Sequence, residues 1–80
     1  MVIEVKLMAQ FKKHLPDPDC PDHTCSLEVI EHARVEDVMN RLNISKKIPK
    51  LFMINYRYAK EDDVLKEGDK LAVYPRLSGG

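Results

Sequence analysis

The chain has 80 residues, of which 13 are basic and 13 are acidic, so its formal net charge is zero. A chain of this length forms one small domain, with no room for a second core or for the large cleft that most enzymes use. The balanced charge gives no sign of nucleic acid as a partner, and no apolar run approaches the ~20 residues that span a bilayer. The first residues also lack the apolar stretch of a signal peptide. We therefore expect a cytoplasmic protein that binds no nucleic acid and no membrane.

Two strands are predicted in the first part of the chain. In residues 2–9 the apolar side chains Ile3, Val5 and Leu7 alternate with polar ones, which is typical of a half-buried strand. Residues 25–31 alternate in the same way, with Cys25, Leu27 and Val29 on one face. We expect these two strands to pair.

A long polar connection, Gln10 to Thr24, separates the two strands. Within it, residues 16–22 hold three prolines and three aspartates in seven positions, which excludes a regular helix or a central strand. Phe11 to Leu15 has room for one helical turn before the prolines. Connections of this length are usually functional or disordered, and we expect this one to be the most mobile internal segment.

The period then changes to that of a helix. Apolar residues at positions 35, 38, 39 and 42 follow the i, i+3, i+4, i+7 pattern of an amphipathic helix. Its expected N-cap position holds Arg34, which offers no side-chain oxygen for a capping bond worth ~1 kcal/mol. Asn43 is a plausible residue for the C-terminal end.

Three more strands are predicted after the helix. Leu51 to Asn55 forms a strand, Tyr56 to Ala59 a turn into a short edge strand, and Lys70 to Pro75 the last strand, with Leu71 and Val73 inward and Tyr74 outward. Gly68 stands in a turn where a positive φ is expected. Pro75 lacks an N–H and should end the last strand.

This order of elements predicts an α+β fold, in which one main helix covers one face of a mixed sheet of four to five strands. Placing the first and last strands side by side and parallel requires a right-handed crossover that carries the helix. We expect a single domain over residues 1–80, with residues 76–80 as a flexible C-terminal tail.

The tail ends in Leu77-Ser78-Gly79-Gly80. Two glycines carry no Cβ atoms, so they can pass through a channel too narrow for other residues. The group that this tail offers to chemistry is the α-carboxylate of Gly80, which is a poor acyl donor until a partner activates it. A frayed terminus is the alternative interpretation, because chain ends are commonly disordered.

Residues 64–80 resemble the closing segment of the MoaD/ThiS sulfur carriers, small ubiquitin-like proteins of the β-grasp fold. The shared pattern is a leucine, a Gly-Asp turn, an alternating strand, a proline and a Gly-Gly tail, here Leu65, Gly68-Asp69, residues 70–75 and Gly79-Gly80. Weaker agreement extends over nearly the whole chain. The proline and the Ser-Gly-Gly ending are most similar to the small subunit of molybdopterin synthase.

The chain departs from this family pattern in three places. Arg76 stands where the molybdopterin carriers often have a second proline, and Arg34 replaces a capping threonine or serine. The loop rich in proline, aspartate and cysteine has no clear counterpart. These departures bear on the choice of pathway rather than on the carrier role.

The resemblance implies a carrier protein that is itself no enzyme and holds no cofactor. An E1-like adenylyltransferase would adenylate the Gly80 carboxylate, and sulfur would then displace AMP and leave a thiocarboxylate on that residue. Gly79 and Gly80 would be the residues of the chemistry. A synthase large subunit would be the second partner, in molybdenum or tungsten cofactor biosynthesis. The partner-binding residues would be Tyr74, Pro75, Arg76, Leu77 and Ser78.

Other acceptors fit the same tail. A carrier for thiamine synthesis or for tRNA thiolation is one alternative, and a ubiquitin-like modifier that becomes joined through Gly80 to lysines is another. Lysine-linked conjugates, as against a free thiocarboxylate, separate the modifier from the carriers.

Metal binding or redox chemistry is an alternative of a different class. His14, Cys20, His23 and Cys25 are four possible ligands in one loose cluster, whereas zinc sites usually hold two tight pairs. In a reducing compartment two free thiols are expected instead of a disulfide. Either thiol could also hold a persulfide.

Two further groups are candidate contact surfaces. Lys46, Lys47 and Lys50 could dock an acidic partner, although lysines in a connection are ordinarily solvated. Tyr56, Tyr58 and Tyr74 are interface candidates because aromatic residues are enriched at binding hot spots. Packing along a sheet face is the alternative for these tyrosines.

Overall fold

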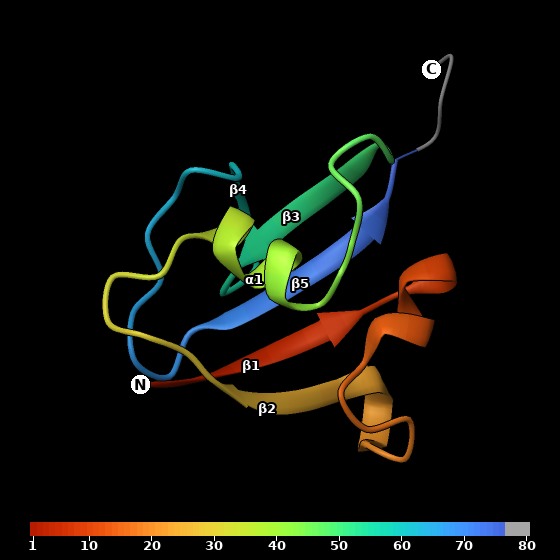
Figure 1. The fold of residues 1–80 in the computed structure, drawn as a ribbon, viewed down its shortest axis with the longest axis horizontal. Helices are drawn as coiled ribbons and strands as arrows, with labels where there is room; N and C mark the ends of the chain where they lie inside the picture. Colours follow the sequence, from red (N-terminus) through yellow and green to blue (C-terminus); the bar gives the residue numbers. More distant parts are fainter. Residues whose placement is uncertain (77–80) are drawn as a thin grey trace.

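A computed structural model describes residues 1–76. A five-stranded sheet, in the order β2-β1-β5-β3-β4, carries one α-helix on one face (Figure 1). The elements are β1 (Val2–Leu7), the 3₁₀ helices η1 (Ala9–His14) and η2 (Pro21–His23), β2 (Thr24–Glu28), α1 (Val35–Arg41), β3 (Lys50–Ile54), β4 (Arg57–Ala59) and β5 (Lys70–Pro75). β1 and β5 are parallel and the other pairs are antiparallel. The predicted α+β, ubiquitin-like β-grasp fold is confirmed.

The core lies between the sheet and α1, and the predicted alternation fills it. Ile3, Val5 and Leu7 of β1 are fully buried, as are Leu71 and Val73 of β5. From the helix, Val35, Val38 and Met39 are buried against them, and Leu42 and Ile44 follow. The periods of two and 3.6 residues therefore point the apolar sets of strand and helix at one another.

The start of α1 is capped in a way that the sequence did not reveal. The Asp37 carboxylate accepts a hydrogen bond of 2.9 Å from the Arg34 backbone N–H. The N–H groups of Val35 and Glu36 donate to the backbone carbonyls of Asp63 and Glu61, at 3.0 and 2.8 Å. A neighbouring segment thus satisfies the N–H groups that an N-cap side chain usually serves.

α1 ends at Arg41, and Asn43, the residue predicted for its C-terminal cap, follows the C-cap Leu42 with a φ of 60°. The Ile44 N–H donates to the Met39 carbonyl at 2.9 Å, and the Asn43 N–H donates to the Asn40 carbonyl at 3.1 Å. This pair of bonds is a Schellman motif, and the burial of Ile44 supplies the apolar contact that usually accompanies it.

The first two strands are shorter than predicted. β1 stops at Leu7 because Ala9 has a φ of 53° and begins η1. β2 covers 24–28 instead of 25–31, since the chain turns away after Val29 and His32 takes a φ of 64°. The predicted positive φ of Gly68 is confirmed at 81°.

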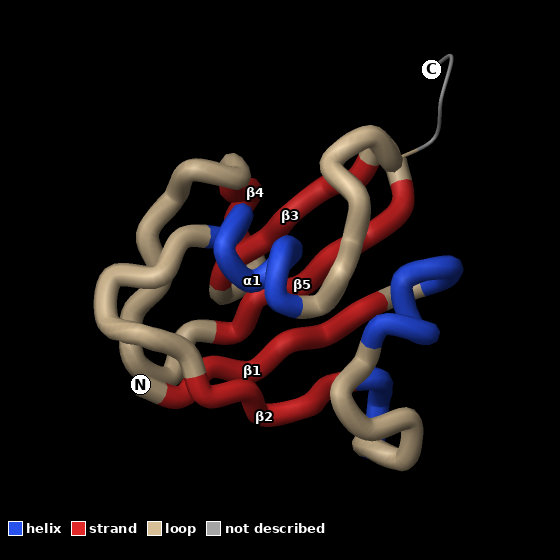
Figure 2. The backbone as a smooth tube through the Cα atoms, viewed as in Figure 1, coloured by secondary structure: helices blue, strands red, loops and turns tan. Residues whose placement is uncertain are grey.

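The connection between β1 and β2 contains more structure than its composition indicates. The expected helical turn is present as η1, and Phe11 within it is fully buried in the core. The Nδ1 atom of His14 lies 2.9 Å from the Leu42 carbonyl, which fastens η1 to the end of α1. η1 therefore contributes to the core, which the polar composition of the connection does not indicate. Most of the proline-rich part between η1 and η2 is loop (Figure 2). High mobility of the connection from Gln10 to Thr24 stays a prediction.

We predict that Phe11→Ala lowers the free energy of unfolding by about 3–5 kcal/mol, because it removes a fully buried aromatic side chain from a packed core. Denaturant unfolding measures this loss. The matched control is Lys13→Ala in the same 3₁₀ helix, where the side chain is exposed and the change should stay within about 0.5 kcal/mol. Equal small losses for both variants would show that η1 does not contribute to the core.

Candidate functional site

The candidate site is the end of β5 together with the sheet face that α1 leaves uncovered. β5 pairs with both of its neighbours, and its register places Pro75 opposite Lys50 of β3. The strand ends at Pro75, as predicted, and Arg76 is exposed. The chain therefore leaves the sheet at the end where β1 and β5 both point, beside the 43–49 connection (Figure 1).

We call the uncovered side the open face and define it by the side chains that alternate with the core residues. One row crosses the sheet through directly paired positions: Thr24, Lys6, Ala72, Met53 and Tyr58. Tyr74 and its pairing partner Leu51 lie on the same face, nearer to the end of β5. Tyr74 is half-buried whereas its neighbour Val73 is fully buried, so the predicted outward orientation of Tyr74 is confirmed.

The open face contains a hollow of about 70 Å³ at its centre. Its lining consists of Lys6, Asp22, Thr24, Met53, Tyr56, Lys70, Ala72 and Tyr74. The Lys6 ammonium and the Asp22 carboxylate form an ion pair of 3.3 Å at its edge. Two lysines, a methionine and two tyrosines thus surround a depression too small for a substrate but suited to one protruding side chain.

The β3–β4 turn brings Tyr56 to this hollow. Asn55 and Tyr56 have φ values of 52° and 69°, the left-handed pair that a type I′ hairpin turn requires. The Asn55 side chain accepts the Lys70 N–H at 3.0 Å and donates to the Asp69 carboxylate at 2.9 Å. Asn55 therefore fixes the turn against the start of β5. Nothing in the sequence pattern indicated this link.

Lys70 is a basic group that contacts Tyr56. Its ammonium lies 3.4 Å from the Tyr56 hydroxyl and 5.6 Å from the centre of the ring. The hydrogen bond to the tyrosine raises the pKa of Lys70 above its ordinary value, and the charge of Glu4 adds to this effect. Lys70 is consequently a firmly charged group at the edge of the hollow.

The three tyrosines differ in exposure. Tyr56 and Tyr58 are 77% and 79% exposed, so packing along the sheet does not account for them. Tyr74 is half-buried: it lines the hollow and lies opposite Leu51 of β3. Exposed aromatic residues beside a half-buried one form the kind of surface that protein interfaces use.

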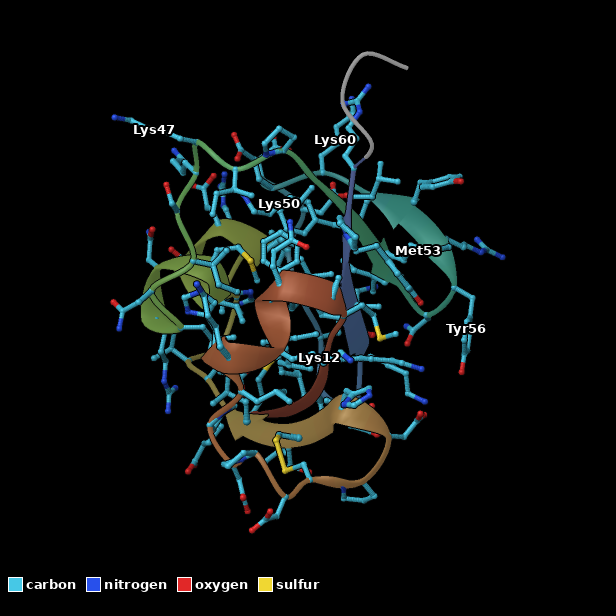
Figure 3. All side chains as sticks on the ribbon, turned by 90° about the vertical axis from the view of Figure 1, so that its right-hand side faces the viewer. Lys12, Lys47, Lys50, Met53, Tyr56 and Lys60 are labelled. Atoms are coloured by element: carbon cyan, nitrogen blue, oxygen red, sulfur yellow. A yellow bond between two sulfur atoms is a disulfide. The ribbon has the colours of Figure 1, made fainter. Side chains whose placement is uncertain are left out.

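The three predicted lysines separate into two roles. Lys46 and Lys47 are exposed, as expected for a connection. Lys50 is half-buried: its ammonium donates to the carbonyls of Ser45, at 2.7 Å, and Ile48, and lies 5.9 Å from the Phe11 ring centre (Figure 3). Burial lowers the pKa of Lys50. Lys50 therefore holds the 45–48 turn beside the end of β5 instead of facing solvent.

The prediction of two free thiols is wrong. Cys20 and Cys25 form a disulfide, with their Cα atoms 5.5 Å apart. The turn that begins at Asp17 brings Cys20 back to β2, because the Cys20 N–H donates to the Asp17 carbonyl at 3.2 Å. Sequence spacing alone could not show this reversal, since a separation of five residues also fits an extended segment.

The disulfide uses both cysteine sulfurs, so neither is available as a thiolate ligand for a metal ion. Within residues 1–76, no three His, Cys, Asp or Glu side chains gather where they could hold a metal ion. His14, one of the four predicted ligands, instead contacts the Leu42 carbonyl. Across the same residues, no helix has the length and apolar character needed to cross a bilayer.

The remaining predicted site residues, Leu77, Ser78, Gly79 and Gly80, lie outside the described residues. Of the residues predicted to bind a partner, the structure places Tyr74, Pro75 and Arg76 in succession at the end of β5. It adds Lys6, Met53 and Lys70 of the open face, which the sequence analysis did not single out. The sequence signal that could have found these residues is their alternation with core residues along β1, β3 and β5.

Comparison with known proteins supports the assignment of the fold. No family model matches the chain, and no curated protein matches it by sequence. Solved structures do match. SAMP1 from Haloferax volcanii superposes with a TM-score of 0.71 at 21% identity and covers 100% of both chains. A candidate molybdopterin converting factor, subunit 1, from Pyrococcus furiosus superposes with a TM-score of 0.71 at 23% identity, over 95% of this chain and 98% of that one.

A further structure, of small archaeal modifier protein 1 from H. volcanii, gives a TM-score of 0.72 at 19% identity, over 95% of this chain and 98% of that chain. Similarity at this level of identity shows the fold. The chain is thus a small protein with the ubiquitin-like β-grasp fold found in these modifier and converting-factor proteins.

We predict that the two faces of β5 respond differently to the same charge. Tyr74→Asp should lower the free energy of unfolding by about 1 kcal/mol or less, because Tyr74 lies on the open face. Val73→Asp should lower it by more than about 4 kcal/mol, because it buries an unpaired carboxylate. Thermal and denaturant unfolding of both variants test this. A larger loss for Tyr74→Asp than for Val73→Asp would mean that the faces are assigned wrongly.

Proposed function

We propose that this protein is a sulfur carrier whose Gly80 carboxylate is adenylated and converted to a thiocarboxylate. The observation that carries the proposal is the end of β5: the strand stops at Pro75 at the rim of the sheet, and Arg76 is exposed immediately before Leu77-Ser78-Gly79-Gly80. The β-grasp fold and its likeness to a candidate molybdopterin converting factor subunit support the same function.

The proposed chemistry belongs to the partners, and the protein acts as their substrate and accessory subunit. An E1-like adenylyltransferase joins the Gly80 carboxylate to AMP from Mg-ATP, with release of pyrophosphate. A sulfide sulfur then attacks the acyl carbon, AMP leaves, and a thiocarboxylate remains. A persulfide sulfur displaces AMP in the same way but leaves an acyl disulfide, and a further thiol must attack the outer sulfur of that bond, forming a new disulfide, before the thiocarboxylate is released. The two terminal glycines suit a narrow channel, since neither brings a side chain to the reacting centre.

We further propose that the sulfur is delivered to a molybdopterin synthase large subunit, in molybdenum or tungsten cofactor biosynthesis. The Ser-Gly-Gly ending and Pro75 favour this acceptor over thiamine synthesis. The protein would then work in the cytoplasm, where disulfides are uncommon. The Cys20–Cys25 bond is consequently a feature that the carrier role does not explain.

A ubiquitin-like modifier is the second candidate, and two fold neighbours favour it because they are described as a small archaeal modifier protein and as SAMP1. A modifier would use the same activated Gly80 carboxyl group. The nucleophile would be a lysine amine of another protein instead of sulfur.

We predict that the protein gains the mass difference between one sulfur and one oxygen atom when it is incubated with the E1-like partner, Mg-ATP and a sulfur source. Intact-mass spectrometry and fragmentation should place the sulfur on Gly80. Deletion of Gly80 should abolish the gain, and Gly79→Val should block it because a β-branched side chain crowds the backbone. Lys47→Ala, a change of an exposed side chain in the 43–49 connection, is the control that should still gain sulfur.

Sulfur found on Cys20 or Cys25 after deletion of Gly80 would refute the carrier mechanism in this form. Lysine-linked conjugates in cells without any thiocarboxylate would instead identify the protein as a modifier.

We predict that Tyr74→Asp weakens the complex with the adenylyltransferase by about thirtyfold in Kd, corresponding to a hot-spot loss of about 2 kcal/mol. The reason is the position of Tyr74 between the hollow and the end of β5. Asn40→Asp introduces the same charge on the exposed side of α1 and should leave Kd unchanged. Titration calorimetry measures both, and equal affinities would place the contact elsewhere.

A further inference from the structure

The Cys20–Cys25 disulfide joins two parts of the molecule with different surroundings. Cys25 belongs to β2, pairs with Val5 and is 3% exposed. Cys20 is half-buried in the turn before η2. Figure 3 shows the bond at the outer side of β2, away from α1. One sulfur thus belongs to the sheet and the other to a surface turn.

We propose that Cys20–Cys25 is a redox modification site that reacts with a dithiol reductant, and that its state sets where the Asp22 turn lies on the open face. The turn comprises residues 17–23. Residues 17–23 take no part in the pairing of the strands, and none of them belongs to the core cluster. The domain can therefore keep its fold while this bond opens and closes.

The reaction follows from the difference in access. A thiolate of the reductant attacks the Cys20 sulfur, the bond between the two protein sulfurs breaks, and Cys25 leaves as a thiolate that takes up a proton. The second thiol of the reductant then attacks the mixed disulfide and releases Cys20 as a thiol. In total the dithiol gives two electrons and two protons to the protein and becomes a disulfide itself.

The surroundings of Cys25 suit the reduced form as well. Its Sγ atom lies 3.3 Å from the Asp17 carbonyl oxygen, so the thiol of the reduced protein has an acceptor already in place. The same carbonyl receives the Cys20 N–H at 3.2 Å. A buried thiol with an acceptor is a stable product of the reduction.

The closed bond also holds an unusual backbone. Asp22 and His23 both have a φ of 55°, and two successive left-handed residues without a glycine are unfavourable. This conformation carries the Asp22 carboxylate to Lys6, 3.3 Å away on the open face, although Asp22 is 79% exposed and Lys6 only 25%. An exposed ion pair contributes little by itself. The disulfide two residues before Asp22 is a covalent restraint on this turn, beside the hydrogen bond of 2.9 Å that the Thr24 hydroxyl donates to the Asp22 carbonyl.

Opening of the bond should release Asp22 from Lys6 and leave that ammonium unpaired at the hollow. Asp22 and Lys6 line the same hollow as Tyr74. The redox state of the cysteines is thereby linked to the proposed docking surface, and this last link alone rests on the proposed function. The partner would meet a more basic open face after reduction.

The first test counts thiols. The full chain is equilibrated in its folded state with oxidised or reduced dithiothreitol, quenched with acid, and alkylated with iodoacetamide in denaturant, so that the buried Cys25 thiol also reacts. The number of alkyl groups is then read by mass spectrometry. We expect no alkyl groups on the oxidised protein, two on the reduced protein, and full return to none after reoxidation. Two alkyl groups on the oxidised protein, or reoxidation to linked dimers only, would overturn the proposal.

The second test follows the turn by amide NMR in the same two states. On reduction we expect shifts at Lys6, Asp22 and Tyr74, with Val38 and Met39 of α1 unchanged as a check that the fold persists. Asp22→Asn should change the chemical shift of the Lys6 amide in the oxidised protein, and it should abolish most of the change in that shift on reduction. A Lys6 amide that is identical in both states would overturn the link, and neither test needs a partner protein. The sulfur-carrier function can therefore fail while this inference stands, or the reverse.

Discussion

The parallel pairing of β1 with β5 is the constraint on which the rest of the structure depends. It joins the first and last strands of the described chain at the middle of the sheet, with Val5 opposite Leu71 and Leu7 opposite Val73. All four side chains are fully buried. Because β1 and β5 are parallel, the chain must cross from the β2 side of the sheet to the β3 side between them. This crossover carries α1 over one face of the sheet. The same geometry directs the end of β5 to the rim.

Backbone hydrogen bonds at two places stabilise this arrangement of β1, β5 and α1. At one end, Gly68 turns the chain into β5 with a positive φ, and its N–H donates to the Val2 carbonyl at 2.8 Å. At the other side, the 61–65 segment runs along the start of α1, where the Leu65 N–H donates to the Ala33 carbonyl at 2.7 Å. The irregular segment between β4 and β5 thus serves as the cap of α1, and an N-cap side chain at Arg34 is not required.

The elements that sequence reasoning recovered are those in which one local rule decides the structure. Alternation placed Ile3 and Leu71 inward, and the 3.6-residue period placed Val35 and Val38 against them. Gly68 and Asn43 were found because a positive φ restricts the residue type. Together with the resemblance of residues 64–80, these rules were sufficient for the fold.

What sequence reasoning missed depends on contacts between distant segments. Phe11 was placed in a polar connection, yet the core around Leu42 and Val73 has a site for it. Lys50 was expected to be a solvated lysine, but its ammonium donates a hydrogen bond to the Ser45 carbonyl. The Cys20–Cys25 bond depends on a turn built around Asp17, and no periodic pattern records such a turn. In the candidate site, Tyr74 could be predicted by alternation, whereas the approach of Asp22 to Lys6 could not.

The division of β5 into two faces explains how one strand can serve both stability and recognition. Leu71 and Val73 point into the core, so Lys70 and Tyr74, which alternate with them on the other face, can differ in chemistry without loss of the fold. Lys70 and Tyr74 use that freedom on the open face, beside a hollow bordered by the Asp22 turn. A partner that reads this face lies next to the point where the chain leaves the sheet. The proposed recognition of the open face would therefore take place beside the end of β5, the strand that also fills the core.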